Sequence, residues 1–240
     1  MNNYKSIYVP DNCSHVKLDI GLSMTAPISN KWLVKEPNLL VLGYEPVIEN
    51  CQNILTINNG RPHCFPDFIL EKQFLDDKRF QLFNYAIENV DNEIVGNMYV
   101  NRNDTGTSSL YSHNQTILGP IKGLQKTNII SLKMIFDNFP WEKFDYIDYI
   151  KIDAQGSDFN ILKSAGDYLK EKVVYVTAEP DGHYYIGAEL CIEENITAYM
   201  ESQNFIKITH PNTVDPTYLN KKFIHLKDDI FIHQCGPWPC

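Results

Sequence analysis

The sequence has few basic residues, no long apolar run and no apolar leader. Only 21 Lys and Arg stand against 30 Asp and Glu, which gives a formal net charge of −9. Nucleic acids and anionic lipid surfaces are bound by basic surfaces, so no nucleic-acid partner is expected. No run of 18 apolar residues occurs, so no membrane span is expected. The opening residues MNNYKSIYVPDN lack the apolar core of a secretion signal, so we expect a cytoplasmic protein.

Closely spaced cysteine pairs are also absent. The six cysteines stand at positions 13, 51, 64, 191, 235 and 240, and no CxxC motif occurs. This spacing disfavours a structural zinc site. We predict free thiols in a reducing compartment, with a disulfide inside the terminal CGPWPC as the alternative.

The chain has what one ordinary globular domain needs. Its 240 residues are 43% hydrophobic and 21% charged, and this length suits a single large core. We predict one domain over residues 1–240, in which 56–78 and 93–127 are insertions.

Apolar stretches alternate with helical patterns along the chain. Helices are predicted at 157–169, where Ser157 can cap, and at 191–203, and a strand leading into a short helix at 128–136. Such alternation predicts an α/β fold with a doubly wound, mostly parallel sheet. The predicted strands are 15–21, 39–46, 79–87, 145–153, 172–180, 204–210 and 221–234, with 93–102 as an antiparallel excursion.

Four of these strands end on an acid: Asp19, Glu45, Asp153 and Glu179. Ligands of doubly wound sheets bind outside the carboxyl ends of the strands. We therefore expect these carboxylates to meet in one crevice. The alternative is that each acid only caps the helix that follows.

The acids admit two classes of cofactor, a dinucleotide or S-adenosylmethionine. A carboxylate at Glu45 can accept hydrogen bonds from both hydroxyls of a ribose. After Gly21 the chain continues LSMTAP, without the further glycines of the GxGxxG fingerprint that a pyrophosphate requires. This absence favours S-adenosylmethionine.

The segment YIKIDAQGSDFNILKSA resembles the signature of FkbM-family methyltransferases, as do LDIGLS, LGYEP, FNYAI and GTSSL. These motifs follow one another in the family's order from residue 15 to about 180. The resemblance implies a class I methyltransferase fold, with a Rossmann-like sheet of seven strands whose last strand is antiparallel. It also implies S-adenosylmethionine as the methyl donor and a hydroxyl acceptor. Two departures are Thr25, where the family often has a second glycine, and Gln155, where it commonly has Glu.

Site residues follow from the resemblance. Asp19 and Gly21 would hold the methionine part of the cofactor, Glu45 the ribose and Ala86 with its neighbours the adenine, while Asp153 would lie near the sulfonium. The cofactor-binding set is Asp19, Gly21, Ser23, Glu45, Pro46, Asn84, Tyr85, Ala86 and Asp153.

A hydroxyl acceptor needs a group that removes its proton. Our catalytic candidates are Asp153, Glu179 and His183, with His210 as a further possible base. Asp153 and Glu179 could instead bind Mg²⁺ or Mn²⁺, which would acidify the acceptor hydroxyl, and the alternative is a metal-free site. The candidates for contact with the acceptor are Ser108, Ser109, Gln155, Asp181 and Tyr184.

The predicted function is therefore S-adenosylmethionine-dependent O-methylation of a sugar hydroxyl in a glycan or glycoconjugate. The alternatives are methylation of a small natural product, a dinucleotide-dependent oxidoreductase, and a non-catalytic scaffold. We expect a carbohydrate or small-molecule acceptor as the partner, with a homodimer left open.

Overall fold

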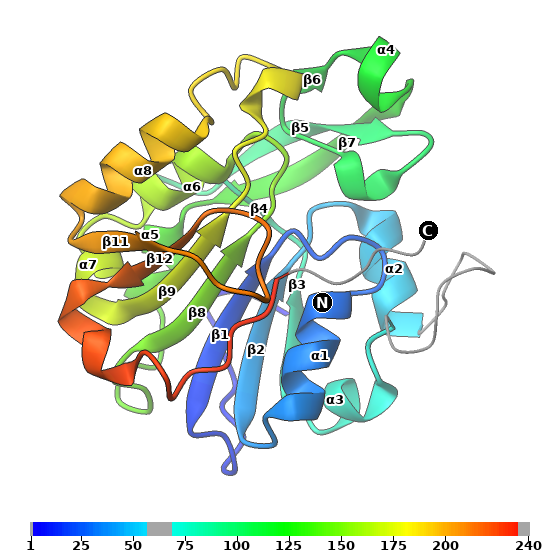
Figure 1. Ribbon diagram of the computed structural model, residues 1–240. Coiled ribbons are helices and arrows are strands. Elements are labelled where there is room, and N and C mark those ends of the chain that lie inside the picture. Colours follow the sequence, from blue (N-terminus) through cyan, green and yellow to red (C-terminus); the bar gives the residue numbers. More distant parts are fainter. Residues whose placement is uncertain (1, 57–68, 235–240) are drawn as a thin grey trace.

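The computed structural model describes residues 2–56 and 69–234 (Figure 1). Its centre is a seven-stranded sheet in the order β11-β12-β9-β8-β1-β2-β3. These strands are β1 (His15–Ile20), β2 (Leu39–Tyr44), β3 (Phe80–Phe83), β8 (Ile147–Ile152), β9 (Val173–Ala178), β11 (Phe205–Ile208) and β12 (Thr217–Asn220). The prediction of an α/β fold with a mostly parallel seven-stranded sheet is confirmed.

Strand β12 is the exception to the parallel arrangement. It pairs antiparallel with both β9 and β11, whereas β1, β2, β3, β8 and β9 pair parallel with one another. The chain crosses from β1 to β2 on one side and reaches β8 on the other, so β1 and β8 flank the topological switch point of the sheet.

The sheet is buried on both faces. In β2, Leu40 and Leu42 pack into one apolar cluster and Leu39 and Val41 into the other, as the period of two in a strand requires. One cluster includes side chains of α5 (Leu132–Asp137), α6 (Asp158–Ser164), α7 (Tyr168–Lys172) and α8 (Glu193–Ser202). The other includes those of α1 (Pro27–Lys35), α2 (Ile48–Thr56) and α3 (Lys72–Asp76). Figure 1 shows these two helix layers on either side of the strands.

A second, smaller group of elements follows β3. Strands β4 (Ala86–Ile87), β7 (Ile121–Ile130) and β5 (Ile94–Asn101) form a three-stranded sheet, in which β5 and β7 are antiparallel. The segment between them contains a 3-10 turn (Thr105–Thr107), β6 (Ser112–His113) and α4 (Gln115–Leu118), and β6 pairs with β10 (Tyr185–Ile186) after a 3-10 turn at Gly182–Tyr184. The antiparallel excursion expected at 93–102 is therefore present as β5.

Three expected elements differ in the structure. The strand predicted at 221–234 is wrong, because the strand ends at Asn220 and a 3-10 helix (Lys221–Leu226) follows, capped where the Asn220 side chain accepts from the Lys222 N–H. The strand predicted at 79–87 is divided between β3 and β4, since the Asn84 amide turns back to the carbonyl of Pro46, 3.0 Å away. The helix predicted at 157–169 is divided at Gly166, whose φ is +58°.

Some predictions fall on residues outside the described ranges. Cys64, Cys235 and Cys240 lie there, as does most of the 56–78 insertion, whose described part includes α3. Cys13, Cys51 and Cys191 are free thiols. No helix within residues 2–56 and 69–234 is long and apolar enough to cross a membrane.

Candidate active site

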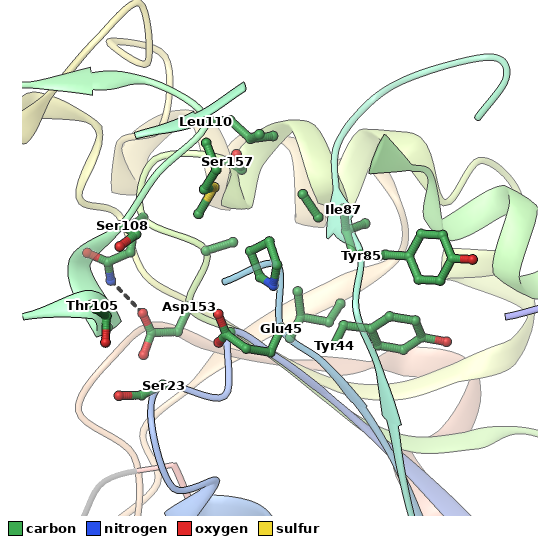
Figure 2. Close-up of a pocket in the computed structure, with 18 residues that line it drawn as sticks. Ser23, Tyr44, Glu45, Tyr85, Ile87, Thr105, Ser108, Leu110, Asp153 and Ser157 are labelled. Atoms are coloured by element: carbon green, nitrogen blue, oxygen red, sulfur yellow. Dashed lines mark hydrogen bonds between the residues drawn. The ribbon is translucent and has the colours of Figure 1, made fainter. Parts of the chain in front are cut away.

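A cavity opens at the carboxyl ends of β1, β2 and β8, beneath the second group of strands. The empty space among its lining atoms, counted together with the solvent at the open mouth, is about 460 Å³. In Figure 2 the Tyr44 and Tyr85 rings lie on one side and Ser23, Thr105 and Ser108 on the other. The lining residues are Ile20, Gly21, Ser23, Tyr44, Glu45, Pro46, Tyr85, Ala86, Ile87, Met98, Thr105, Gly106, Ser108, Leu110, Asp153, Ala154, Gln155 and Ser157.

Glu45 follows β2 directly and is 3% exposed. Its Oε1 accepts hydrogen bonds from the Val47 N–H at 2.9 Å and from the Asn50 amide at 3.1 Å. Burial raises the pKa of this carboxyl to about 7, although both hydrogen bonds oppose the rise. The side chain is thus held in one orientation at the cavity, where a carboxylate can accept hydrogen bonds from a polar ligand.

The part of the cavity lining that lies beside Glu45 in the fold is largely apolar, and we call it the apolar slot. Tyr44, Pro46, Tyr85, Ala86 and Ile87 line it. The slot is braced from behind, since the Asn84 amide donates to the carbonyl oxygens of both Glu45 and Pro46, at 2.9 and 3.0 Å. Aromatic and apolar side chains next to a fixed polar group make a surface suited to a flat ring that carries hydroxyl groups.

Gly21 brings the ends of β1 and β8 into direct contact. Its φ is +82°, and a Cβ at this position would lie 1.8 Å from the Asp153 carbonyl oxygen. Only glycine fits such a conformation and such a close approach. The Asp153 N–H in turn donates to the Ile20 carbonyl at 3.0 Å. The Asp153 side chain is thereby placed at the switch point.

A buried lysine supports the acids of β1 and β8. Lys151 Nζ donates to the Gly21 carbonyl at 2.7 Å and lies 3.5 Å from Asp19 Oδ1 and 3.3 Å from Asp153 Oδ2. Burial acts to lower the pKa of Lys151, but the charges of Asp153 and Asp19 outweigh it and the pKa is raised. Lys151 is therefore a permanent cation in this site.

Asp153 and Glu179 are neighbours with opposite pKa shifts. The Gln155 amide donates to Asp153 Oδ1 at 2.6 Å and to Glu179 Oε2 at 3.1 Å, and the first bond is the dashed line in Figure 2. Burial acts to raise the pKa of Asp153, but the opposing effect of Lys151 and the hydrogen bonds is larger. The pKa of Asp153 therefore lies below its usual value. Burial and the charge of Asp153 raise the pKa of Glu179. Near neutral pH the pair then carries one negative charge, on Asp153.

Nine of the predicted site residues line the cavity. They are Gly21, Ser23, Glu45, Pro46, Tyr85, Ala86, Ser108, Asp153 and Gln155.

Other predicted residues lie behind the residues that line the cavity. Asp19 is buried and accepts from the Ser29 hydroxyl at 2.6 Å, and the Ser109 hydroxyl donates to the Gln155 carbonyl at 2.6 Å. Asn84 braces the slot, and Glu179 contacts the site through Gln155. These four side chains hold the lining residues in place.

Predicted residues of the 181–184 loop and His210 do not line the cavity. Asp181 is buried near Asp158 and Cys191. His183 is exposed, and its ring lies 3.8 Å from that of Tyr184. A histidine after a strand carries no signal of which way its side chain turns, so the sequence alone left this open.

Several lining residues were not predicted. Tyr44 and Ile87 flank predicted ones, so proximity in the sequence could have found them. Met98, Thr105 and Leu110 come from the second group of strands, and only the way this group folds over the sheet places them.

The arrangement of donors does not fit a metal ion between Asp153 and Glu179. Both Asp153 oxygens already face donors, Lys151 Nζ and Gln155 Nε2, and the amide N–H groups that would repel a cation lie between the two acids. Within the described ranges, two groups bring three potential ligands within 4.8 Å of one another, and neither contains Asp153 or Glu179. They are His15, Glu36 and Asp148, and Asp158, Asp181 and Cys191.

The fold and cavity define an α/β protein with an open cavity at the carboxyl ends of its central strands, the place where doubly wound sheets bind ligands. The sequence matches the family model described as Methyltransferase FkbM domain over residues 35–207, more than half of the chain. The chain therefore belongs to the FkbM methyltransferase family, as its motifs predicted. No curated protein matches the sequence.

Proposed function

We propose that this chain is an S-adenosylmethionine-dependent O-methyltransferase that methylates a hydroxyl group of a sugar in a glycan or glycoconjugate. One observation carries the proposal. A single cavity combines the fixed Glu45 carboxylate, an apolar slot beside it and the ionised carboxylate of Asp153.

The residues present fit the cofactor that the family implies. Glu45 would accept hydrogen bonds from the ribose hydroxyls, and the slot between Pro46 and Ile87 would take the adenine ring. Gly21 and Ser23 would bind the methionine part. When bound, S-adenosylmethionine supplies a methyl group on a positively charged sulfur. The negative charge of Asp153 would attract this sulfonium and so favour binding of the cofactor.

Asp153 is the residue best placed to accept a proton from the acceptor hydroxyl. It lines the cavity and its side chain is 30% exposed, so a ligand can contact it. Lys151 and Gln155 keep it ionised and fix its orientation, and a base must be positioned within hydrogen-bond reach to act. We propose that Glu179 stays protonated and neutral beside the ionised Asp153.

A hydroxylated acceptor is supported by the polar groups beside Asp153. Thr105, Ser108 and Gln155 line the same part of the cavity and can donate to or accept from sugar hydroxyls. A small natural product with a hydroxyl group would meet the same chemistry and is the second candidate. Family membership gives the oxidoreductase alternative no support. A cytoplasmic location belongs to the proposal, and the homodimer remains a prediction.

The test is calorimetric titration of the purified chain with S-adenosylhomocysteine. We expect a dissociation constant in the micromolar range, and Glu45→Ala should weaken it at least about tenfold, which corresponds to about 1.4 kcal/mol. Glu49→Ala is the matched control, because Glu49 lies on α2 and pairs on the surface with Lys122 at 2.8 Å. Equal loss in both variants would refute the Glu45 assignment. Binding of NAD in place of S-adenosylhomocysteine would refute the methyltransferase proposal.

The acceptor is tested separately by transfer of a labelled methyl group from S-adenosylmethionine to a panel of mono- and oligosaccharides. Addition of EDTA should leave the rate unchanged, because Asp153 is held by Lys151 and Gln155. A rate that EDTA abolishes and Mg²⁺ or Mn²⁺ restores would contradict this metal-free arrangement.

A further inference from the structure

Tyr185, at the start of β10, lies outside the cavity lining yet contacts its key amide. The Tyr185 hydroxyl donates to Gln155 Oε1, the amide oxygen opposite the nitrogen that bridges Asp153 and Glu179. We propose that Tyr185 is a positioning residue: through Gln155 it holds the Asp153 and Glu179 carboxyls together as one acid pair. This inference rests on the proposed role of Asp153 as the base.

The direction of the amide follows from its partners. The Tyr185 hydroxyl needs an acceptor, and an ionised carboxylate needs a donor. Only one orientation of Gln155 satisfies both, with Oε1 toward Tyr185 and Nε2 toward the two acids. A turned amide would place its oxygen against Asp153 Oδ1 and leave the tyrosine hydroxyl without its shortest acceptor. Burial raises the pKa of Tyr185, so the hydroxyl keeps the proton it donates.

The backbone around Gln155 is built to keep this geometry. Gln155 has φ +54° and Gly156 has φ +95°, two successive left-handed residues. Such a conformation is costly for a residue other than glycine and persists only where its surroundings fix it. The Ser109 hydroxyl holds the Gln155 carbonyl at 2.6 Å, and a Cβ on Gly156 would lie 3.2 Å from the Tyr185 Cβ. Tyr185 therefore packs directly on the loop that presents Gln155.

Asp158 fixes the position of Glu179, the second acid of the pair. This buried side chain accepts from the Ala154 N–H at 3.0 Å and from the Glu179 N–H at 2.8 Å, so it ties the end of β8 to the end of β9. The titratable and charged groups around Asp153 are Lys151 and Asp19 from the sheet, Glu179 and Asp181 after β9, Asp158 at the start of α6, and Asp215 before β12. Lys151 is the one cation in this group, so each uncharged hydrogen-bond donor to Asp153 contributes to keeping Asp153 ionised.

The test is the titration of side-chain carboxyl groups by ¹³C NMR of the full chain, without any ligand. The Asp153 and Glu179 signals are assigned by their loss in Asp153→Asn and Glu179→Gln. In Tyr185→Phe the amide is free to turn away, and Asp153 loses a donor to its ionised form. We expect the Asp153 titration to move upward by about one pH unit. Tyr184→Phe, which changes the neighbouring half-buried tyrosine, should leave it unmoved.

A double-mutant comparison separates positioning from simple packing. Gln155→Met should raise the Asp153 titration by at least as much as Tyr185→Phe, and Tyr185→Phe should add nothing further in the Gln155→Met background. An unmoved Asp153 titration in Tyr185→Phe would overturn the inference, and so would an equal, additive shift in the double variant.

The NMR titration and the binding measurement separate a failure of this inference from a failure of the proposed function. Binding of S-adenosylhomocysteine should stay within about twofold of the wild type in Tyr185→Phe, because Tyr185 does not line the cavity. If the wild type fails to bind S-adenosylhomocysteine, the proposed function fails whatever the NMR titration shows. If the wild type binds it and the titration is unmoved, only the role of Tyr185 fails.

Discussion

The two ends of the central sheet each bury a lysine, and the two lysines are used differently. At the amino end, Lys17 of β1 pairs with Glu36 and the Phe231 carbonyl, and its ammonium lies over the Trp32 and Phe231 rings. At the carboxyl end, Lys151 of β8 is shared between Asp19 and Asp153. Burial lowers the pKa of Lys17, whereas the carboxylates around Lys151 raise its pKa above the usual value.

The difference shows which of the two ion pairs faces a cavity that a ligand can enter. Lys17 meets one carboxylate and two aromatic rings, so its surroundings neutralise it and serve stability. Lys151 is shared by two carboxyl groups, and one of them, Asp153, faces the cavity. A carboxyl group with a shifted pKa in a cleft is more typical of binding and catalytic sites than of structural ion pairs.

The largest effect should come from Lys151→Met. Removing the shared cation leaves the buried Asp19 and the 30% exposed Asp153 without their partner, and breaking a buried pair costs roughly 3–5 kcal/mol. We expect a loss of this size in the free energy of unfolding, measured by urea denaturation at pH 7. A loss below about 1 kcal/mol would mean that the acids are already neutral and that the contrast between the two sheet ends is mistaken.

Gly21→Ala should follow closely. A Cβ would collide with the Asp153 carbonyl at 1.8 Å and would have to adopt φ +82°, so we expect a destabilisation of about 3 kcal/mol. Gly166→Ala is the matched control, since Gly166 has φ +58° and nothing within 4 Å of its Cβ position. It should cost only the backbone strain of about 1 kcal/mol. Similar losses in thermal or urea unfolding would show that the close approach of β1 and β8 is not a constraint.

Glu45→Gln should change how stability depends on pH. Burial raises the pKa of Glu45 from its ordinary 4.5 to about 7, so the folded chain holds this proton more tightly than the unfolded chain. The resulting stability is fully present below pH 4.5 and is lost as the pH rises through 7. The wild type should therefore lose roughly 2–3 kcal/mol relative to Glu45→Gln over this interval. Parallel stability curves for the two proteins would contradict the prediction.

Lys17→Met should have the smallest effect. The methionine keeps much of the apolar stem against Trp32, and Glu36 is left within 3.7 Å of His15 and partly accessible to water. The substitution removes one partner of the pair, so Glu36 and the Phe231 carbonyl lose a donor, but Glu36 keeps its contact with His15 and with water. We therefore expect a loss of about 1–2 kcal/mol, smaller than in Lys151→Met. Urea unfolding beside Lys151→Met provides the direct comparison, and equal losses would remove the distinction between the two ends.

The fold could be predicted largely because burial on both faces leaves a strong pattern. Strand 39–44 is a continuous apolar run and strand 147–152 is mostly apolar, and the acids after them mark the carboxyl edge of the sheet. Predictions failed where a local polar interaction changed the chain direction. Asn220 caps a 3-10 helix where β-branched and aromatic residues suggested a strand, and Asn84 divides β3 from β4.

The site was only partly predictable for a related reason. Glu45 and Asp153 could be found because their position relative to a strand fixes their place in space. Lys151 stood in the recognised motif, but its contact with Asp19 depends on the pairing of β1 with β8. The roles of Met98, Thr105 and Tyr185 depend on how distant segments pack over the strand ends, and no local pattern carries that information.

The place of β12 inside the sheet sets the order in which the chain can be completed. Strand β12 lies between β9 and β11 in the sheet but follows both in the sequence. Neither strand can therefore pair on that side until residues 217–220 have been synthesised. Until then, two apolar strands present open edges, which other chains can join. We therefore expect a chain that ends just before Thr217 to be prone to aggregate.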